Sequence, residues 1–149
     1  MTLVLCIPLL IQAVLMFIDE IHFHRLRGLP RWERVGHPID TFSVLLCYGV
    51  ALTQPPSGGA LTVYAALAIL SCLLITKDEF VHARLCPPAE QWLHALLFVV
   101  HPIVLGATGL LWFKHKTAIL AGQSAMTVAF GCYQLIYWNH PWKRHPRAQ

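Results

Sequence analysis

Apolar residues dominate five long stretches of the chain, and short polar or proline-containing stretches separate them. The apolar stretches cover roughly residues 2–24, 31–53, 60–83, 88–113 and 117–139. A helix that crosses a bilayer takes about 20 mostly apolar residues, so each stretch is long enough. The pattern predicts an all-α integral membrane protein with five transmembrane helices, and residues 1–149 are read as a single transmembrane domain.

Prolines and glycines support these boundaries. Pro30 precedes the second stretch and Pro87-Pro88 precede the fourth. A proline in the first turn of a helix costs no hydrogen bond there. Residues 54–59, which contain two prolines and two glycines, are typical of a turn between the second and third helices.

Composition agrees with a membrane protein. Of the 149 residues, 56% are hydrophobic and 12% charged, whereas a soluble domain carries about 25% charged residues. The net charge is +4, but the basic residues lie in short connections rather than along an aromatic-studded surface, so no nucleic acid partner is expected. Membrane lipid is the expected partner. The N-terminal stretch lacks the basic segment and cleavage site of a signal peptide, which predicts a retained first helix.

The distribution of Lys and Arg predicts the orientation of the chain. One face of the predicted helices carries nine basic residues, and the other carries Lys114 and Lys116. Basic residues favour the cytoplasmic side. The N-terminus is therefore expected outside and the C-terminus in the cytoplasm, in the inner or plasma membrane if the protein is bacterial. The nine residues are Arg25, Arg27, Arg31, Arg34, Lys77, Arg84, Lys143, Arg144 and Arg147.

The chain also contains an internal repeat. A Glu-xxx-His pattern at Glu33 and His37 recurs 57 residues later at Glu90 and His94. A second acid and histidine pattern, ending at His24, recurs 58 residues later and ends at His82. The repeat predicts two similar hairpins, about 2–53 and 60–113, around a pseudo-twofold axis in a four-helix bundle. The fifth helix, about 117–139, is added outside.

All seven acids of the chain lie in or beside four helix ends, together with histidines. Residues four apart share a helical face, and carboxylate oxygen with imidazole nitrogen is a donor set that iron, manganese and zinc accept. The pattern leaves open whether Asp19 and His22 or Glu20 and His24 face inward, and whether Asp78 or Glu79 does. The candidate metal ligands are Glu20, His24, Glu33, His37, Asp78, Glu79, His82, Glu90 and His94.

Two further residues are candidates for a catalytic or supporting role. Asp40 lies seven residues after Glu33 and is expected to orient a ligating histidine. His101 lies seven residues after His94, about 10 Å further along the same helix. It is expected to donate a proton or to support the site deeper in the bundle. The five cysteines show no CxxC spacing and indicate no disulfide framework, and the four that lie inside apolar stretches are read as small buried hydrophobes.

The order of these donors resembles that of ferritin-like di-iron and di-manganese carboxylate proteins. In those bundles two helices each supply a Glu, and two supply a Glu-x-x-His pair. The spacing from Glu to His is four residues in this chain rather than three, and His24 and His82 are additional. The resemblance implies a bundle that holds two divalent metal ions, with iron favoured and manganese or zinc as alternatives. The corresponding donors are Glu20, Glu33 with His37, Asp78 or Glu79, and Glu90 with His94.

Redox catalysis is the function that this interpretation favours. A di-iron oxidoreductase would hydroxylate, desaturate or oxidise a lipid-soluble small molecule with oxygen, and an electron-donor protein would be a further partner. The alternative is a metal carrier or exporter, or a metal-responsive membrane partner protein without catalysis. Two other readings remain open: a salt-bridge network without metal, and haem ligation by His37, His94 or His101.

Overall fold

The computed structural model describes residues 2–139, and every regular element within them is helical. The tail residues His140, Trp142, Lys143, Arg144, His145 and Arg147, three of which entered the orientation argument, lie outside the described residues. The elements are α1 (Thr2–Ile18), a π-helical segment η1 (Asp19–His24), α2 (Arg25–Arg27), α3 (Arg31–Thr53), α4 (Gly58–Ile75), a 3₁₀ segment η2 (Thr76–Asp78), α5 (Glu79–Leu85), α6 (Pro88–Phe113) and α7 (Thr117–Asn139).

The helix boundaries follow from the residues at the turns. Gly28 has φ of 76°, in the region that favours glycine, and it ends α2 so that the chain can turn into α3. Pro30 and Pro87 are the capping residues before α3 and α6. The Ser57 side chain accepts a hydrogen bond from the Ala60 amide at the start of α4.

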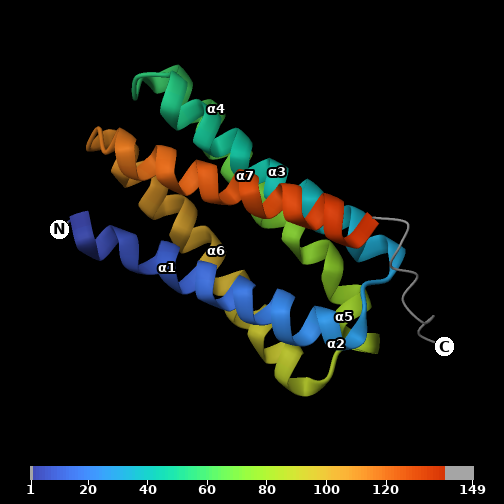
Figure 1. The fold of residues 1–149 in the computed structure, drawn as a ribbon. Helices are drawn as coiled ribbons and strands as arrows, with labels where there is room; N and C mark the ends of the chain where they lie inside the picture. The colour runs from blue at the N-terminus through green and yellow to red at the C-terminus, as the bar shows by residue number, and fades with distance from the viewer. Residues whose placement is uncertain (1, 140–149) are drawn as a thin grey trace.

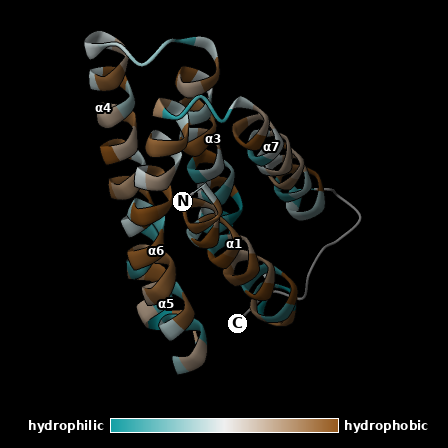
Figure 2. Ribbon diagram, turned by 90° about the vertical axis from the view of Figure 1, so that its left-hand side faces the viewer, coloured by the Kyte–Doolittle hydropathy of each residue, from teal (hydrophilic) through white to brown (hydrophobic). Residues whose placement is uncertain are grey.

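Five helical spans are long and apolar enough to cross a membrane, as the sequence predicts. They are Thr2–Arg27, Arg31–Thr53, Gly58–Leu85, Pro88–Phe113 and Thr117–Asn139. Large apolar side chains point outward from them; Leu3 is 83% exposed and Leu73 is 63% exposed. Hydrophobic colours cover most of each helix in Figure 2. The spans are confirmed by length and composition, and insertion into a membrane stays a prediction.

The helices pack mainly in two groups (Figure 1). α1 packs against α6, whereas α3 packs against both α4 and α7. The apolar core contains Tyr48, Leu111 and Leu120, and it occupies the half of the bundle away from η1 and α5. The Tyr64 hydroxyl ties α4 to α6 there by donating to the Leu105 carbonyl at 2.6 Å. The other half contains the buried acids and histidines.

Candidate metal centre

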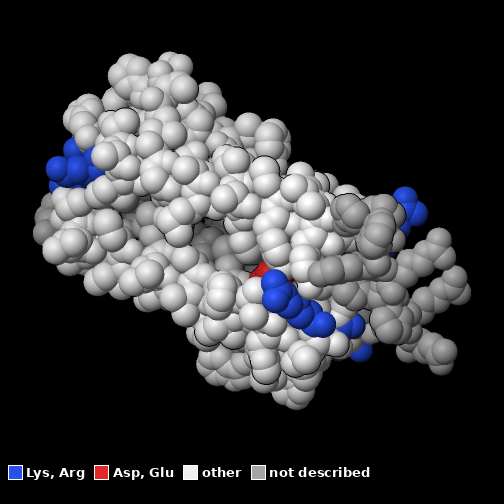
Figure 3. All heavy atoms as spheres, viewed as in Figure 1, with Lys and Arg blue, Asp and Glu red and all other residues white. Residues whose placement is uncertain are grey.

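Five carboxylates from four segments are buried at one level of the bundle. Asp19 and Glu20 come from η1, Glu33 from α3, Asp78 from η2 and Glu90 from α6, and none is more than 7% exposed. On the face in Figure 3, acidic atoms show at one spot, at the base of a hollow and beside a basic side chain. The helix ends that the sequence predicts to carry a polar layer therefore do meet.

The π-helical segment η1 decides which residues of the first helix face this layer. A π turn bonds residues five apart rather than four, so Asp19 and His24 come to the same side. His24 Nε2 lies 3.1 Å from Asp19 Oδ2, and His24 Nδ1 lies 3.1 Å from Glu20 Oε2. His22 is exposed. Such segments inside α-helices occur often at functional sites.

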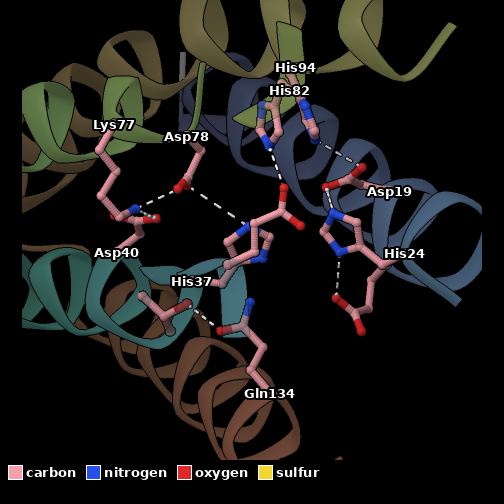
Figure 4. Close-up of polar contacts among 12 residues, drawn as sticks. Asp19, His24, His37, Asp40, Lys77, Asp78, His82, His94 and Gln134 are labelled. Carbon is pink, nitrogen blue, oxygen red and sulfur yellow. Dashed lines mark hydrogen bonds and ion pairs between the residues drawn. The ribbon is translucent and has the colours of Figure 1, made fainter. Parts of the chain in front are cut away.

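One compact group of donors contains Asp19, His24, Glu90 and His94. One ligand atom from each of these four buried residues lies within 4.8 Å of the others. His94 Nε2 is 3.1 Å from Asp19 Oδ1, which joins α6 to η1 (Figure 4). Two carboxylates and two imidazoles are the donor set that iron, manganese and zinc accept. The group can therefore hold a metal ion.

Further donors adjoin this group on the side of α3 and α5. His82 Nε2 lies 3.3 Å from Glu33 Oε1, and His37 Nε2 lies 3.9 Å from Asp78 Oδ2. Imidazole rings connect these donors with the compact group. The ring centroids of His24 and His37 are 4.9 Å apart, and the rings of His82 and His94 stack at 3.7 Å. Eight of the nine predicted ligands thus lie in or beside the layer. The ninth, Glu79, is exposed and forms no ion pair within residues 2–139.

Two basic side chains enter the layer. Arg27 Nη1 lies 2.9 Å from Glu33 Oε2, and its Nη2 lies 2.8 Å from Glu90 Oε1. Lys77 Nζ bonds to Asp40 at 2.6 Å and to Asp78 at 3.0 Å. A salt-bridge network without metal would draw on the six basic residues near the acids, and in the described part of the chain these two pair with acids, whereas Arg25 lies over an aromatic ring. The six are Arg25, Arg27, Arg31, Arg34, Lys77 and Arg84.

The charges of the layer do not balance. Six carboxylates, the five buried ones and Asp40, face the two cations bonded to them, which leaves four negative charges. A buried charge without a partner costs several kcal/mol. Protons on the carboxylates or the histidines, or bound cations, must therefore compensate. Two divalent ions would supply the charge required if all six carboxylates are ionised.

The fifth long helix also reaches the layer. Glu20 Oε1 accepts hydrogen bonds from the Tyr133 hydroxyl at 3.0 Å and from Trp138 Nε1 at 2.6 Å. Glu20 in turn bonds to His24, so α7 helps to orient that imidazole. Sequence reasoning placed this helix outside the bundle. The α7 segment carries no acid or histidine, so no local pattern marks its two donors.

The two catalytic candidates lie at the edge of the layer or deeper. Asp40 bonds to Lys77, and it forms no hydrogen bond or ion pair with a histidine among the described residues. His101 Nε2 lies 3.0 Å from the Ser71 hydroxyl, which lies 2.7 Å from the Ser43 hydroxyl. On the other side of the ring, His101 Nδ1 lies 3.4 Å from Gln12 Nε2. His101 is thus held in place by polar side chains other than the predicted ligands.

A cavity of about 330 Å³ connects His101 with the layer. The carboxylates and histidines line one end, and the remaining wall is mostly apolar, with Val44, Leu97 and Phe98 among its residues. Its rim includes Phe17 of α1 and Met126 of α7, which are 65% and 61% exposed. The cavity therefore opens sideways between α1 and α7, at a surface covered by apolar side chains.

No protein family model, curated protein or solved structure matches this chain. The chain is therefore classified by its own features. It is an all-helical protein with five helices apolar enough to cross a membrane, and it has buried groups of His, Asp, Glu and Cys that could hold a metal ion.

Proposed function

We propose that this chain is an integral membrane oxidoreductase that binds two divalent metal ions, iron by preference, and acts on a lipid-soluble substrate with oxygen. The observation that carries the proposal is the joining of two features: the buried histidine and carboxylate layer forms one end of an apolar cavity that opens sideways. A site for a small apolar ligand beside redox-competent donors is the combination that such a reaction needs.

Membrane insertion is supported by the apolar outer surface and by the five long spans. Arg25, Arg31 and Arg84 are exposed at the end of the bundle that holds the layer. The positive-inside rule puts that end in the cytoplasm. An electron-donor protein would dock on this basic end, which is also the end nearest the layer.

Two ions are supported by charge and by symmetry. The first ion would lie among Asp19, His24, Glu90 and His94, and the second among Glu33, His37, Asp78 and His82. The first set comes from η1 and α6, and the second from α3 with η2 and α5. A pseudo-twofold that exchanges the two hairpins would exchange these two sets. Two divalent ions would also cancel the four uncompensated negative charges.

The chain's own residues would bind and orient the substrate. The apolar cavity wall would hold a hydrocarbon chain and exclude water, while the gap between α1 and α7 would admit it from the bilayer. Glu20, fixed by Tyr133 and Trp138, would hold His24 in its ligating orientation. Bound iron would supply oxygen activation. His101, on the cavity wall, is placed to exchange a proton with a polar group of the substrate.

Metal content is the first test, because the chain offers matched neighbouring residues. The untagged protein, purified in detergent, is analysed for metals beside His24→Ala and Asp78→Asn. The exposed neighbours provide the controls His22→Ala and Glu79→Gln. About two irons per chain in the wild type and the controls, with fewer in the two buried variants, would support the proposal. A folded, metal-free wild type would refute it.

Catalysis is tested separately by filling the cavity. Ala13 lines the cavity from α1, whereas its neighbour Val14 is exposed and lies outside the lining. Ala13→Phe should keep its metal but lose oxygen consumption and the lipid products that mass spectrometry detects in membranes containing the wild type. Val14→Phe should behave as the wild type does. Equal activity in both variants would mean that the cavity does not bind the substrate.

A metal carrier is the second candidate, and one observation favours it. Polar contacts continue from the layer into the bundle through Ser43, Ser71, His101 and Gln12. A carrier should move Mn²⁺ or Fe²⁺ into sealed liposomes, and Ser71→Ala should slow that uptake. Metal that stays bound to the protein without any flux would favour the enzyme.

A further inference from the structure

Cys86 lies beside the histidines of the layer. It is the one cysteine outside the predicted apolar stretches, and the sequence assigns it no role. It ends α5, where its amide donates to the His82 carbonyl at 3.0 Å. Residues four apart share a helical face, so the Cys86 thiol and the His82 ring lie on the same side. Pro87 and Pro88 then turn the chain at once into α6, which carries His94.

These three residues form a compact buried group. One ligand atom each from His82, Cys86 and His94 lies within 4.8 Å of the others. His82 is 3% exposed, Cys86 7% and His94 4%. Glu33 Oε1, 3.3 Å from His82 Nε2, offers an oxygen as a fourth ligand. Two nitrogens, a sulfur and an oxygen match the four-coordinate sites that zinc and similar ions adopt.

The histidines of this group have unused nitrogens. His82 Nδ1 and His94 Nδ1 are both buried and have no hydrogen-bond partner among the described residues. A buried polar atom without a partner costs about 1–3 kcal/mol, and native structures contain few of them. The two rings stack at 3.7 Å, so both can turn a nitrogen toward one ion.

We propose that Cys86 supplies a thiolate ligand to a metal ion held between His82 and His94, an inference that rests on the proposed metal binding by the layer. The two ions are then unequal: His94 ligates the sulfur-bound ion in place of the first, which keeps Asp19, His24 and Glu90. A thiolate selects softer, thiophilic divalent ions over magnesium or calcium. The thiol proton is released to solvent when the metal–sulfur bond forms.

Cobalt(II) is the probe that tests this assignment, because a cobalt–thiolate bond adds a near-ultraviolet charge-transfer band to the visible bands of the ion. The metal-free full-length protein in detergent is titrated with Co²⁺. We expect both sets of bands in the wild type. Cys86→Ala should lose the near-ultraviolet band and keep visible absorbance from the carboxylate-rich ion. The controls Cys132→Ala, at an exposed position, and Cys47→Ala, in the apolar core, should keep both sets.

The outcomes separate the two proposals. Visible bands without the near-ultraviolet band in the wild type would refute the thiolate and leave metal binding by the layer intact. A near-ultraviolet band that survives in Cys86→Ala would also refute it. No Co²⁺ spectrum at all, in protein that is folded, would remove both proposals. Cys86→Ser, which keeps the size and polarity of the side chain, gives the same readout if the alanine variant does not fold.

Discussion

Arg27 is the residue whose removal tests the charge balance of the layer most directly. Its guanidinium bonds to Glu33 at 2.9 Å and to Glu90 at 2.8 Å, and both carboxylate side chains are 0% exposed. Arg27→Met keeps an unbranched apolar side chain and removes the charge. Removing one partner of a buried ion pair costs about 3–5 kcal/mol, because the other charge stays buried. We expect a loss of this size in metal-free protein.

Bound metal should reduce that loss. In the variant, both oxygens of each freed carboxylate can turn to a cation, so metal should stabilise the variant more than the wild type. A ligand at 100 times its dissociation constant stabilises a protein by about 2.7 kcal/mol. At saturating metal the recovered energy depends on the ratio of the two dissociation constants, at about 1.4 kcal/mol per tenfold. Binding that is 100-fold tighter in the variant would therefore recover about 2.7 of the 3–5 kcal/mol.

The assay is equilibrium unfolding in detergent, followed by tryptophan fluorescence, with a chelator or with saturating Mn²⁺. Arg25→Met is the control, because Arg25 is exposed and bonds to Tyr133 rather than to an acid. Its stability should stay close to that of the wild type in both conditions. A metal-free Arg27→Met as stable as the wild type would show that Glu33 and Glu90 are not charged. An equal loss with and without Mn²⁺ would show that metal does not bind near them.

Two further predictions concern the packing around the site. Ser71→Ala removes the partner of His101 Nε2 and should destabilise the protein by about 1–3 kcal/mol; unchanged unfolding would contradict a structural role for that bond. A side chain at Gly131 would meet Thr41 Cγ2 at 3.1 Å, whereas Gly122 has open space. Gly131→Leu should therefore cost about 1–3 kcal/mol in the same unfolding assay, and Gly122→Leu should cost little. Equal stability of the two leucine variants would refute close packing of α3 on α7.

Much of the fold follows from the sequence. The predicted ranges 31–53, 88–113 and 117–139 coincide with α3, α6 and α7. Long apolar runs bounded by prolines leave a chain few alternatives, because Pro30 and Pro87 end one helix and permit the next. The collection of acids and histidines at one end of the bundle follows for the same reason, since those residues lie at the ends of the runs.

It was harder to predict from the sequence which acids and histidines point into the bundle. A regular helix repeats every 3.6 residues, so a pattern shows which residues share a face only while the helix stays regular. The π-helical η1 and the 3₁₀ segment η2 interrupt this repeat. The sequence left open which acid and histidine of the first helix face inward, and whether Asp78 or Glu79 does, and these residues lie in or next to the two segments. The structure buries Asp19, Glu20 and Asp78 and leaves His22 and Glu79 exposed.

The sequence by itself determined five apolar helices, their boundaries and a layer of acids and histidines at one end. Only the tertiary structure decided that Arg27 lies between Glu33 and Glu90, that Tyr133 and Trp138 hold Glu20, and that Cys86 adjoins the histidines. The physical reason is distance along the chain. Local periodicity sets the direction of a side chain on its own helix. Contacts across a turn between helices, such as Arg27 with Glu33, or between residues 60 or more apart depend on how whole helices pack.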